Sequence, residues 1–374
     1  MRKASIKNKL IALWLIPGLG PRRFRNLLDY FGEIDKIFTA PPRDISKITG
    51  LDQKSAELIP TALDSKRFND ELQLIEKYKI KVVDYTENIY PNLLHEIYDA
   101  PPILYVKGEF DFNNGIPIAF VGSRKASFYG KSMCQKIIKK LAELNKDIVI
   151  VSGLAIGIDS TAHKTALEMG LRTVGVLAGG LSSIYPAQNK NLSEKIASSG
   201  ALLTEFPIAT KPIATNFHLR NRIISGLSRG SVVIEAGKRS GALITARFTT
   251  EQNRELFALP GLADSRFYIG TNRLIQRGQA KLIMDAEDIL EEIMPTTGQQ
   301  TAFNDQPESS SETEDMTGEE AEVLKILRQE NVHQDVIAQR LQIPVHKLMA
   351  ILTKLELEGK IVSKSGSIYE SVSN

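Results

Sequence analysis

Cysteine, histidine and long hydrophobic runs are all scarce in this sequence of 374 residues. The single cysteine, Cys134, excludes a disulfide scaffold and a cysteine-rich zinc module, and it is typical of a reducing compartment. The five scattered histidines leave little material for a metal site. No apolar run approaches the roughly 20 residues that span a bilayer. We therefore expect no metal, no other cofactor and no membrane partner.

A large excess of charge of either sign is also missing. The net charge of +3 neither requires nor excludes a nucleic-acid partner, because local patches matter more than the sum. The hydrophobic fraction of 42% is sufficient for real cores and excludes wholesale disorder. At roughly 100–200 residues per domain, the length predicts about two to three domains.

The N-terminus lacks the full pattern of a secretion signal. Basic residues precede an apolar run at 10–16, but this run is short and ends in Pro17-Gly18 without a small-residue cleavage site. We therefore expect a cytoplasmic protein.

Composition and periodicity divide the chain into four segments. Residues 1–80 are expected to form a helical domain, and residues 81–294 alternate apolar strand-like runs with amphipathic helices. Residues 295–316 contain no Lys or Arg and predict an acidic flexible linker. Residues 317–374 predict three helices and a hairpin, which resembles a winged helix. Because its third helix carries few positive charges, binding of DNA and binding of protein both remain open for this domain.

An internal repeat marks the helical domain. Ile16–Gly20 and Ile48–Asp52 share the pattern apolar-x-Gly-apolar-(Gly/Asp), and a helix follows each. This resembles a helix-hairpin-helix pair, in which a glycine-rich hairpin presents backbone N–H groups to a phosphate. Asp52 stands at the backbone-contact position of the second hairpin. The two hairpins therefore either contact DNA or serve a purely structural role.

Six short apolar runs punctuate the middle segment, each expected to be a buried strand. Continuous apolar strands separated by helices predict an extended Rossmann-like, mostly parallel α/β sheet with both faces covered. Such sheets bind ligands beyond the carboxyl ends of their strands, and the glycine-rich segments all follow strand ends. The runs are 116–121, 147–151, 173–178, 201–204, 231–234 and 256–259.

Several of these strand ends carry residues suited to an anion. Ser152–Asp159 has the glycine spacing of a phosphate-binding loop, although it lacks both the G-x-G-x-x-G and the Walker A pattern; a tight strand-to-helix connection is the alternative. Ser123 and Arg124 could clamp an oxyanion. Arg220 and Arg222 stand two apart, so on a helix one could face a phosphate while the other braces the fold.

Two further motifs have structural alternatives. Ser240 and Gly241 could present the positive end of a helix to an anion. Asp159 and His163, spaced i and i+4, could form an acid–base pair, but such a pair more often supports a helix start. No catalytic triad, metal-ligand cluster or CxxC motif accompanies them, which weakens an enzymatic interpretation.

Six motifs follow one another along the predicted sheet. They are VGSRKASFYG (121–130), SGLAIGIDSTAH (152–163), VLAGGLSSIYPAQNKNL (176–192), LRNRIISGLS (219–228), EAGKRSGALITA (235–246) and FALPG (257–261). In this order they resemble the DprA/Smf family (DNA-processing protein A), and the resemblance covers essentially the full chain. It implies a Rossmann-like domain that binds single-stranded DNA without chemical turnover, a homodimer, protection of incoming DNA, and loading of the recombinase RecA during natural transformation.

The resemblance also implies which residues contact DNA. Candidates for base stacking are Phe128, Tyr129, Tyr185, Phe217 and His218. The candidate DNA-binding residues are Ser123, Arg124, Lys125, Ser152, Gly153, Gly157, Gly179, Gly180, Lys190, Arg220, Asn221, Arg222, Ser240 and Gly241.

The sequence departs from the family pattern at three places. Ile156 stands where the family often has Arg, which puts one phosphate contact in doubt. Leu219 stands where Pro is usual, and Asn253-Arg254 replaces the usual Gly-Arg.

Two enzymatic alternatives remain at this stage. A nucleotide-processing enzyme similar to the phosphoribohydrolases would use Glu235 as its catalytic carboxylate, but the Pro-Gly-Gly-x-Gly-Thr run of that group is absent. A nicotinamide oxidoreductase would need the missing dinucleotide fingerprint. We expect a binding protein with no catalytic residues.

Overall fold

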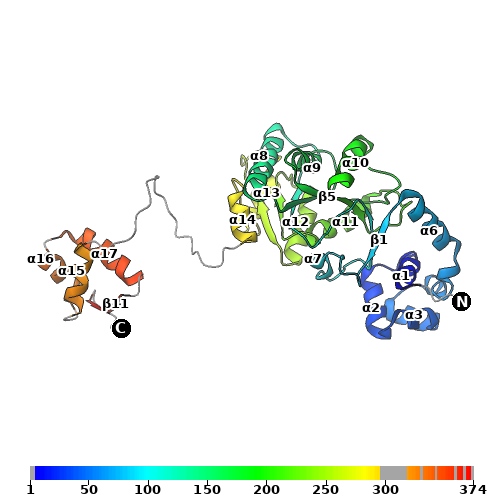
Figure 1. Ribbon diagram of the computed structural model, residues 1–374, viewed down its shortest axis with the longest axis horizontal. Helices are drawn as coiled ribbons and strands as arrows, with labels where there is room; N and C mark the ends of the chain where they lie inside the picture. The colour runs from blue at the N-terminus through cyan, green and yellow to red at the C-terminus, as the bar shows by residue number, and fades with distance from the viewer. Residues whose placement is uncertain are drawn as a thin grey trace. The chain divides into compact units, whose positions relative to one another are not determined.

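The computed structural model describes two compact units (Figure 1), one reaching Gly298 and one beginning at Gln299. The described residues are 5–294, 318–328, 332–341, 343–357, 360–364 and 368–371. The predicted linker at 295–316 lies outside these ranges. Within them, no helix combines the length and hydrophobicity of a transmembrane span.

A nine-stranded sheet forms the centre of the first unit. The strand order is β1-β2-β6-β5-β4-β3-β7-β8-β9, and every pair from β6 to β9 is parallel. The pairs β1–β2 and β2–β6 are antiparallel. This confirms the predicted mostly parallel α/β sheet. The strands are β1 (Lys81–Asp84), β2 (Ile103–Lys107), β3 (Ile116–Val121), β4 (Ile148–Ser152), β5 (Arg172–Val176), β6 (Ala201–Thr204), β7 (Gly230–Val233), β8 (Glu255–Ala258) and β9 (Lys281–Leu282).

Strand β4 shows why the inner strands are apolar throughout. Its side chains alternate between two cores, one on each face of the sheet. Ile148 and Ile150 pack with α8 and α9, whereas Val149 and Val151 pack with α11 and α12. The helices of this region are α7 (Asn92–His95), α8 (Phe128–Leu144), α9 (Ile158–Glu168), α10 (Lys190–Ser199), α11 (Ala214–Gly226), α12 (Ala242–Glu251), α13 (Ile269–Gln276) and α14 (Glu287–Ile293). A 3-10 turn at Ala187–Asn189 precedes α10, and another at Ala62–Asp64 lies among the N-terminal helices.

The chain direction across the sheet reverses at β3. From β3 the chain proceeds to β4, β5 and β6 on one side, and then returns to place β7 on the other side of β3. The loops that leave β3 and β7 therefore diverge, and a crevice opens between them at the carboxyl edge.

The N-terminal helices contain the predicted pair of hairpins. Arg23 links them, because Nη1 donates a 2.8 Å hydrogen bond to the carbonyl of Gly18 and Nη2 a 3.3 Å bond to that of Gly50. Asp52 caps α5 by accepting a 2.9 Å bond from the backbone N–H of Ser55. The helices are α1 (Ile6–Trp14), α2 (Pro21–Phe31), α3 (Ile34–Thr39), α4 (Pro42–Thr49), α5 (Gln53–Glu57) and α6 (Lys66–Tyr78).

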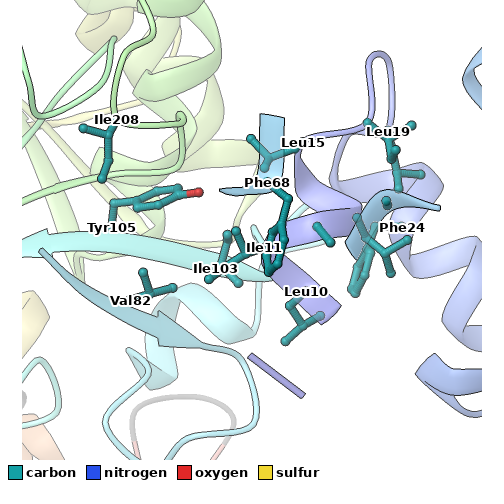
Figure 2. Close-up of a cluster of buried hydrophobic side chains, with 14 of the residues drawn as sticks. Leu10, Ile11, Leu15, Leu19, Phe24, Phe68, Val82, Ile103, Tyr105 and Ile208 are labelled. Atoms are coloured by element: carbon teal, nitrogen blue, oxygen red, sulfur yellow. The ribbon is translucent and has the colours of Figure 1, made fainter. Parts of the chain in front are cut away.

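One hydrophobic cluster joins these helices to the sheet. Figure 2 shows Leu10, Ile11 and Phe68 of the helices beside Ile103 and Tyr105 of β2. The first unit therefore has a continuous core across residues 80 and 81, and the domain boundary predicted there stays a prediction.

The second unit has the order of elements of a winged helix, as predicted. Its three strands pair in the antiparallel order β10-β12-β11, and its helices share one core that includes Val323, Ile337, Leu352 and Tyr369. The elements are α15 (Gly318–Leu327), β10 (Val332–His333), α16 (Gln334–Leu341), α17 (Val345–Leu357), β11 (Ile361–Lys364) and β12 (Ile368–Ser371).

Candidate functional site

A cavity of about 830 Å³ opens at the carboxyl ends of β3 and β7, where the strand order reverses. Its walls come from the loops that follow β3, β4, β5, β6 and β7, from the starts of α9 and α12, and from one side of α11. The lining residues are Val121, Gly122, Ser123, Arg124, Lys125, Ala155, Asp159, Tyr185, Pro212, Ala214, Phe217, His218, Arg220, Asn221, Ile224, Gly237, Arg239, Ser240, Gly241, Ala242 and Thr245.

Two of the wall loops are pressed together at Gly157. This residue has φ +86°, and a Cβ atom there would lie 2.2 Å from the carbonyl oxygen of Ser123. The next residue, Ile158, donates its N–H to that same carbonyl over 3.2 Å. Gly157 thus has a backbone role: it lets the loop after β4 brace the loop that carries Ser123 and Arg124.

The guanidinium of Arg220 is fixed on the cavity floor. Nη1 donates to the carbonyls of Gly153 (2.7 Å) and Val176 (2.5 Å), and Nε donates to Oδ1 of Asn221 (3.1 Å). A Cβ atom at Gly153 would lie 2.2 Å from Nη1, so the close approach requires glycine. The strand ends of β4 and β5 therefore position this arginine.

The charges of Asp159 and Arg220 interact on this floor, and each shifts the pKa of the other. Burial raises the pKa of the Asp159 carboxyl, and the charge of Arg220 opposes that rise. Burial likewise lowers the pKa of Arg220 to about 10, while Asp159 opposes the fall. Arg220 consequently remains protonated at neutral pH and carries a partly desolvated positive charge.

An aromatic ring of the cavity contacts two of the three arginines that line it. The guanidinium carbon of Arg124 lies 4.9 Å from the centre of the Phe217 ring, and that of Arg220 lies 5.8 Å from it. Tyr185 packs edge-on against Phe217 with ring centres 5.8 Å apart. Arg124 and Tyr185 are exposed, so positive charge and aromatic surface are available at the same place.

The start of α12 closes the opposite wall. Ser240 Oγ accepts a 3.3 Å bond from the N–H of Ala242, and the amide of Asn221 donates to the carbonyl of Gly241 over 3.3 Å. The positive end of α12 therefore points at the cavity.

Half of the predicted DNA-binding residues line this cavity, and the other half do not. Ser152 is buried beneath the floor and donates to the carbonyl of Phe120 over 2.6 Å. Gly153 and Gly157 shape the loops from below. The cavity brings together Ser123, Arg124, Lys125, Arg220, Asn221, Ser240 and Gly241.

Arg222, one of the expected DNA contacts, does not line the cavity. Its side chain is 3% exposed and points toward Glu205, whose Oε2 lies 2.5 Å from Nη2. Asp99 lies 3.5 Å from Nε. Of the two alternatives for the pair of arginines, Arg220 faces the cavity and Arg222 braces the fold.

Gly179, Gly180 and Lys190 also lie outside the lining. A Cβ atom at Gly180 would lie 2.0 Å from the carbonyl oxygen of Ile208, so this glycine serves close packing between two loops. Lys190 is exposed at the start of α10. Among the stacking candidates, Tyr185, Phe217 and His218 line the cavity, whereas Phe128 and Tyr129 do not.

The carboxylate of Glu235 is fully engaged away from the cavity. Oε2 accepts a 2.9 Å bond from the backbone N–H of Ser127, and Oε1 accepts bonds from the hydroxyls of Ser127 and Tyr268, the latter over 2.8 Å. Glu235 therefore joins the end of β7 to the start of α8, and it is not among the residues that line the cavity.

His163 is likewise structural. It is buried, its Nδ1 lies 2.7 Å from Oγ1 of Thr173, and burial together with Arg220 lowers its pKa to about 3. This low pKa argues against an acid–base role for His163 at neutral pH. In the described ranges, no cluster of three potential metal ligands is present.

Two ionisable residues that line the cavity, Arg239 and Asp159, are not among the expected DNA contacts. Arg239 directly precedes the expected contacts Ser240 and Gly241, and Asp159 is considered from the sequence only as half of an acid–base pair with His163 or as support for a helix start. Arg239 could have been predicted to line the site, because it lies in the loop that follows an apolar strand. For Asp159 no sequence signal shows that a helix-start carboxylate faces a cavity.

Sequence and structure comparisons agree with this architecture. The family described as DNA recombination-mediator protein A matches residues 81–294, more than half of the chain. The chain belongs to the DprA/Smf family. A DprA winged-helix family matches residues 306–367, and a SAM-like helix-hairpin-helix tandem matches residues 10–63.

Individual DprA/Smf relatives extend the comparison. Protein Smf of Escherichia coli is 36% identical over 325 residues, which cover 85% of this chain and 84% of the relative. DNA processing protein DprA of Bacillus subtilis is 43% identical over 215 residues, covering 57% and 71%.

Two solved structures share the fold. DNA processing protein A from Streptococcus pneumoniae has a TM-score of 0.68 at 35% identity and covers 77% of this chain and 99% of its own. DNA processing protein A from Helicobacter pylori has a TM-score of 0.52 at 28% identity and covers 58% of this chain and 97% of its own; it is described as having a unique single-stranded DNA binding mode.

Proposed function

We propose that this DprA/Smf member binds single-stranded DNA in the cavity at the carboxyl edge of its sheet. The observation that carries the proposal is the contact of Arg124 and Arg220 with the ring of Phe217, because it sets phosphate-binding charge beside a ring on which a base can stack. The comparable protein from Helicobacter pylori is described as binding single-stranded DNA.

The charge of the lining supports a polyanionic ligand. Four of the lining residues carry positive charge: Arg124, Lys125, Arg220 and Arg239. Asp159 is the one acidic residue of this lining. The start of α12 adds a partial positive charge. A chain of phosphates fits this arrangement, and the glycine-rich walls allow its backbone to approach closely.

Fluorescence anisotropy with labelled oligonucleotides tests the proposal. Single strands are expected to bind more tightly than duplexes of equal length, with affinity falling steeply as salt rises. Arg124→Ala is expected to weaken binding about tenfold and to lower the salt dependence, since one phosphate contact is lost.

Arg172→Ala is the matched control. Arg172 also stacks on a phenylalanine, 5.5 Å from the ring centre of Phe110, but it begins β5 and so lies at the amino edge of the sheet. Its loss is expected to leave affinity unchanged. Equal affinity for wild type and Arg124→Ala would refute the cavity as the DNA site.

We infer further that the protein acts as a homodimer that protects incoming DNA and loads RecA, with no catalysed reaction of its own. This follows the family implication; relatives from Bacillus subtilis and Streptococcus pneumoniae are named DNA processing proteins. Sedimentation velocity tests the dimer. RecA-dependent strand exchange on DNA coated with single-strand binding protein tests loading: the protein is expected to shorten the lag, and an unchanged lag would contradict it.

A further inference from the structure

A second cationic and aromatic cluster lies outside the cavity, where α2 meets the segment after α7. The guanidinium carbons of Arg22 and Arg25 lie 5.2 and 5.8 Å from the centre of the Tyr98 ring. The arginines belong to the helix that follows the first hairpin, and the tyrosine is 64% exposed. These three residues are called the Tyr98 patch below.

The arginines of the Tyr98 patch keep their charge available. In the described residues, neither Arg22 nor Arg25 forms an ion pair, and their contact is with the aromatic ring. Other cations of the same helical region are engaged: Lys9 pairs with Asp35, and Arg23 is held by two backbone carbonyls. The two guanidinium groups of the patch are therefore free to pair with the phosphates of a ligand.

The carboxylates beside Tyr98 in the sequence contact other arginines. Glu96 lies 2.6 Å from Nη2 of Arg254, and Asp99 lies 3.5 Å from Nε of Arg222, which also pairs with Glu205. In the described residues neither carboxylate pairs with Arg22 or Arg25, so the two guanidinium groups of the patch stay available to an approaching anion.

We propose that the Tyr98 patch is a second contact for the DNA strand held in the cavity. The two guanidinium groups suit a phosphate, and the exposed ring or the guanidinium planes suit a stacked base. The inference rests on the proposed function of the cavity. It adds that the DNA strand runs from the cavity toward the Tyr98 patch.

Helix α11 connects the two places. Arg220 lies on the cavity floor, and Arg222, two residues later on the same helix, pairs with Asp99, the neighbour of Tyr98. Because these two arginines point apart, the cavity and the patch adjoin different sides of the same helix. Single-strand sites cover about 4–16 nucleotides for one domain, so an oligonucleotide at the upper end of this range can engage both.

Oligonucleotide length separates the patch from the cavity. A strand of about 5 nucleotides is expected to fill the cavity alone, and one of about 16 is expected to reach the patch. The double variant Arg22→Ala/Arg25→Ala is expected to lose about tenfold affinity for the long strand and none for the short one. The slope of log affinity against log salt is expected to become shallower by about 1 to 1.5 for the long strand, as for two lost phosphate contacts.

Matched variants isolate charge and ring. Arg22→Lys/Arg25→Lys keeps the charge and is expected to recover most of the long-strand affinity, whereas Tyr98→Phe keeps the ring and Tyr98→Ala removes it. Arg43→Ala removes an exposed arginine of the same helical region that pairs with Asp44, and it is expected to change nothing.

The outcomes distinguish the two proposals. Wild-type affinity of the double variant for the long strand, together with a loss in Arg124→Ala, overturns the patch and leaves the cavity. Equal losses for both lengths in the double variant also overturn the patch as a separate contact. An effect of the double variant without any effect of Arg124→Ala overturns the cavity and leaves the patch as a DNA contact.

Discussion

The carbonyl oxygen of Gly153 accepts a 2.7 Å hydrogen bond from Nη1 of Arg220, across 67 residues of sequence. This contact fixes the buried arginine of the cavity to the end of β4. It depends on the missing side chain of Gly153, because a Cβ atom would lie 2.2 Å from Nη1 and 2.6 Å from Cζ.

Gly153→Ala should therefore weaken both the fold and DNA binding. The added methyl group displaces the guanidinium of Arg220, and such overpacking costs about 1–3 kcal/mol of unfolding free energy. We expect single-strand affinity to fall about tenfold as well, because one charge of the cavity is misplaced. Chemical denaturation and anisotropy measure the two effects.

Gly20→Ala is the control for that substitution. A Cβ atom at Gly20 meets nothing within 4 Å, so the stability change should stay within about 0.5 kcal/mol. Equal behaviour of the two alanine variants would contradict the structural role assigned to Gly153.

The inner sheet could be predicted from the sequence because its strands are buried on both faces. The apolar runs at 116–121 and 147–151, for example, became β3 and β4 within a residue or two. Of the outer strands, β9 has only two residues and gives no periodic signal. β2 does contain the apolar run Ile103–Val106 and could have been recognised.

The direction of individual side chains was less predictable. The spacing of Arg220 and Arg222 showed that they point apart, but it could not show which one faces inward. Glu205 and Asp99, the partners that decide this, are distant in sequence from Arg222. The same limitation applies to Gly180, whose neighbour Ile208 comes from another loop.

Arg222→Met should strongly destabilise the protein. It leaves Glu205 buried without its counter-charge, and breaking a buried pair in this way costs about 3–5 kcal/mol. The double variant Arg222→Met/Glu205→Met should recover much of this loss, since no buried charge remains. Denaturation curves of the three proteins measure the difference. A mild Arg222→Met variant with weak DNA binding would instead place this arginine in the DNA site.

Glu235→Gln should lower stability, and neither the wild type nor this variant should release free base from AMP. The amide NH₂ would face the N–H of Ser127 or the hydroxyl of Tyr268, which now donate to the carboxylate, at a cost of about 1–3 kcal/mol. Chromatography of AMP incubated with each protein should show no free base. Release of base by the wild type that disappears in Glu235→Gln would establish the phosphoribohydrolase alternative.

His163 should make stability fall with acidification. Its pKa is about 3 in the folded protein, below the ordinary 6.5, because burial and the charge of Arg220 oppose protonation. The unfolded chain takes up the proton first, so the stabilising contribution is present above about pH 6.5 and is lost as the pH falls toward 3. Each pH unit in that window should cost about 1.4 kcal/mol. In His163→Asn, which keeps a polar group near Thr173 but does not titrate, the pH dependence of the unfolding free energy should be shallower by that amount between about pH 6.5 and 4.5. Equal slopes of unfolding free energy against pH for the two proteins would contradict this prediction. They would mean that His163 takes up a proton in the folded protein as readily as in the unfolded chain.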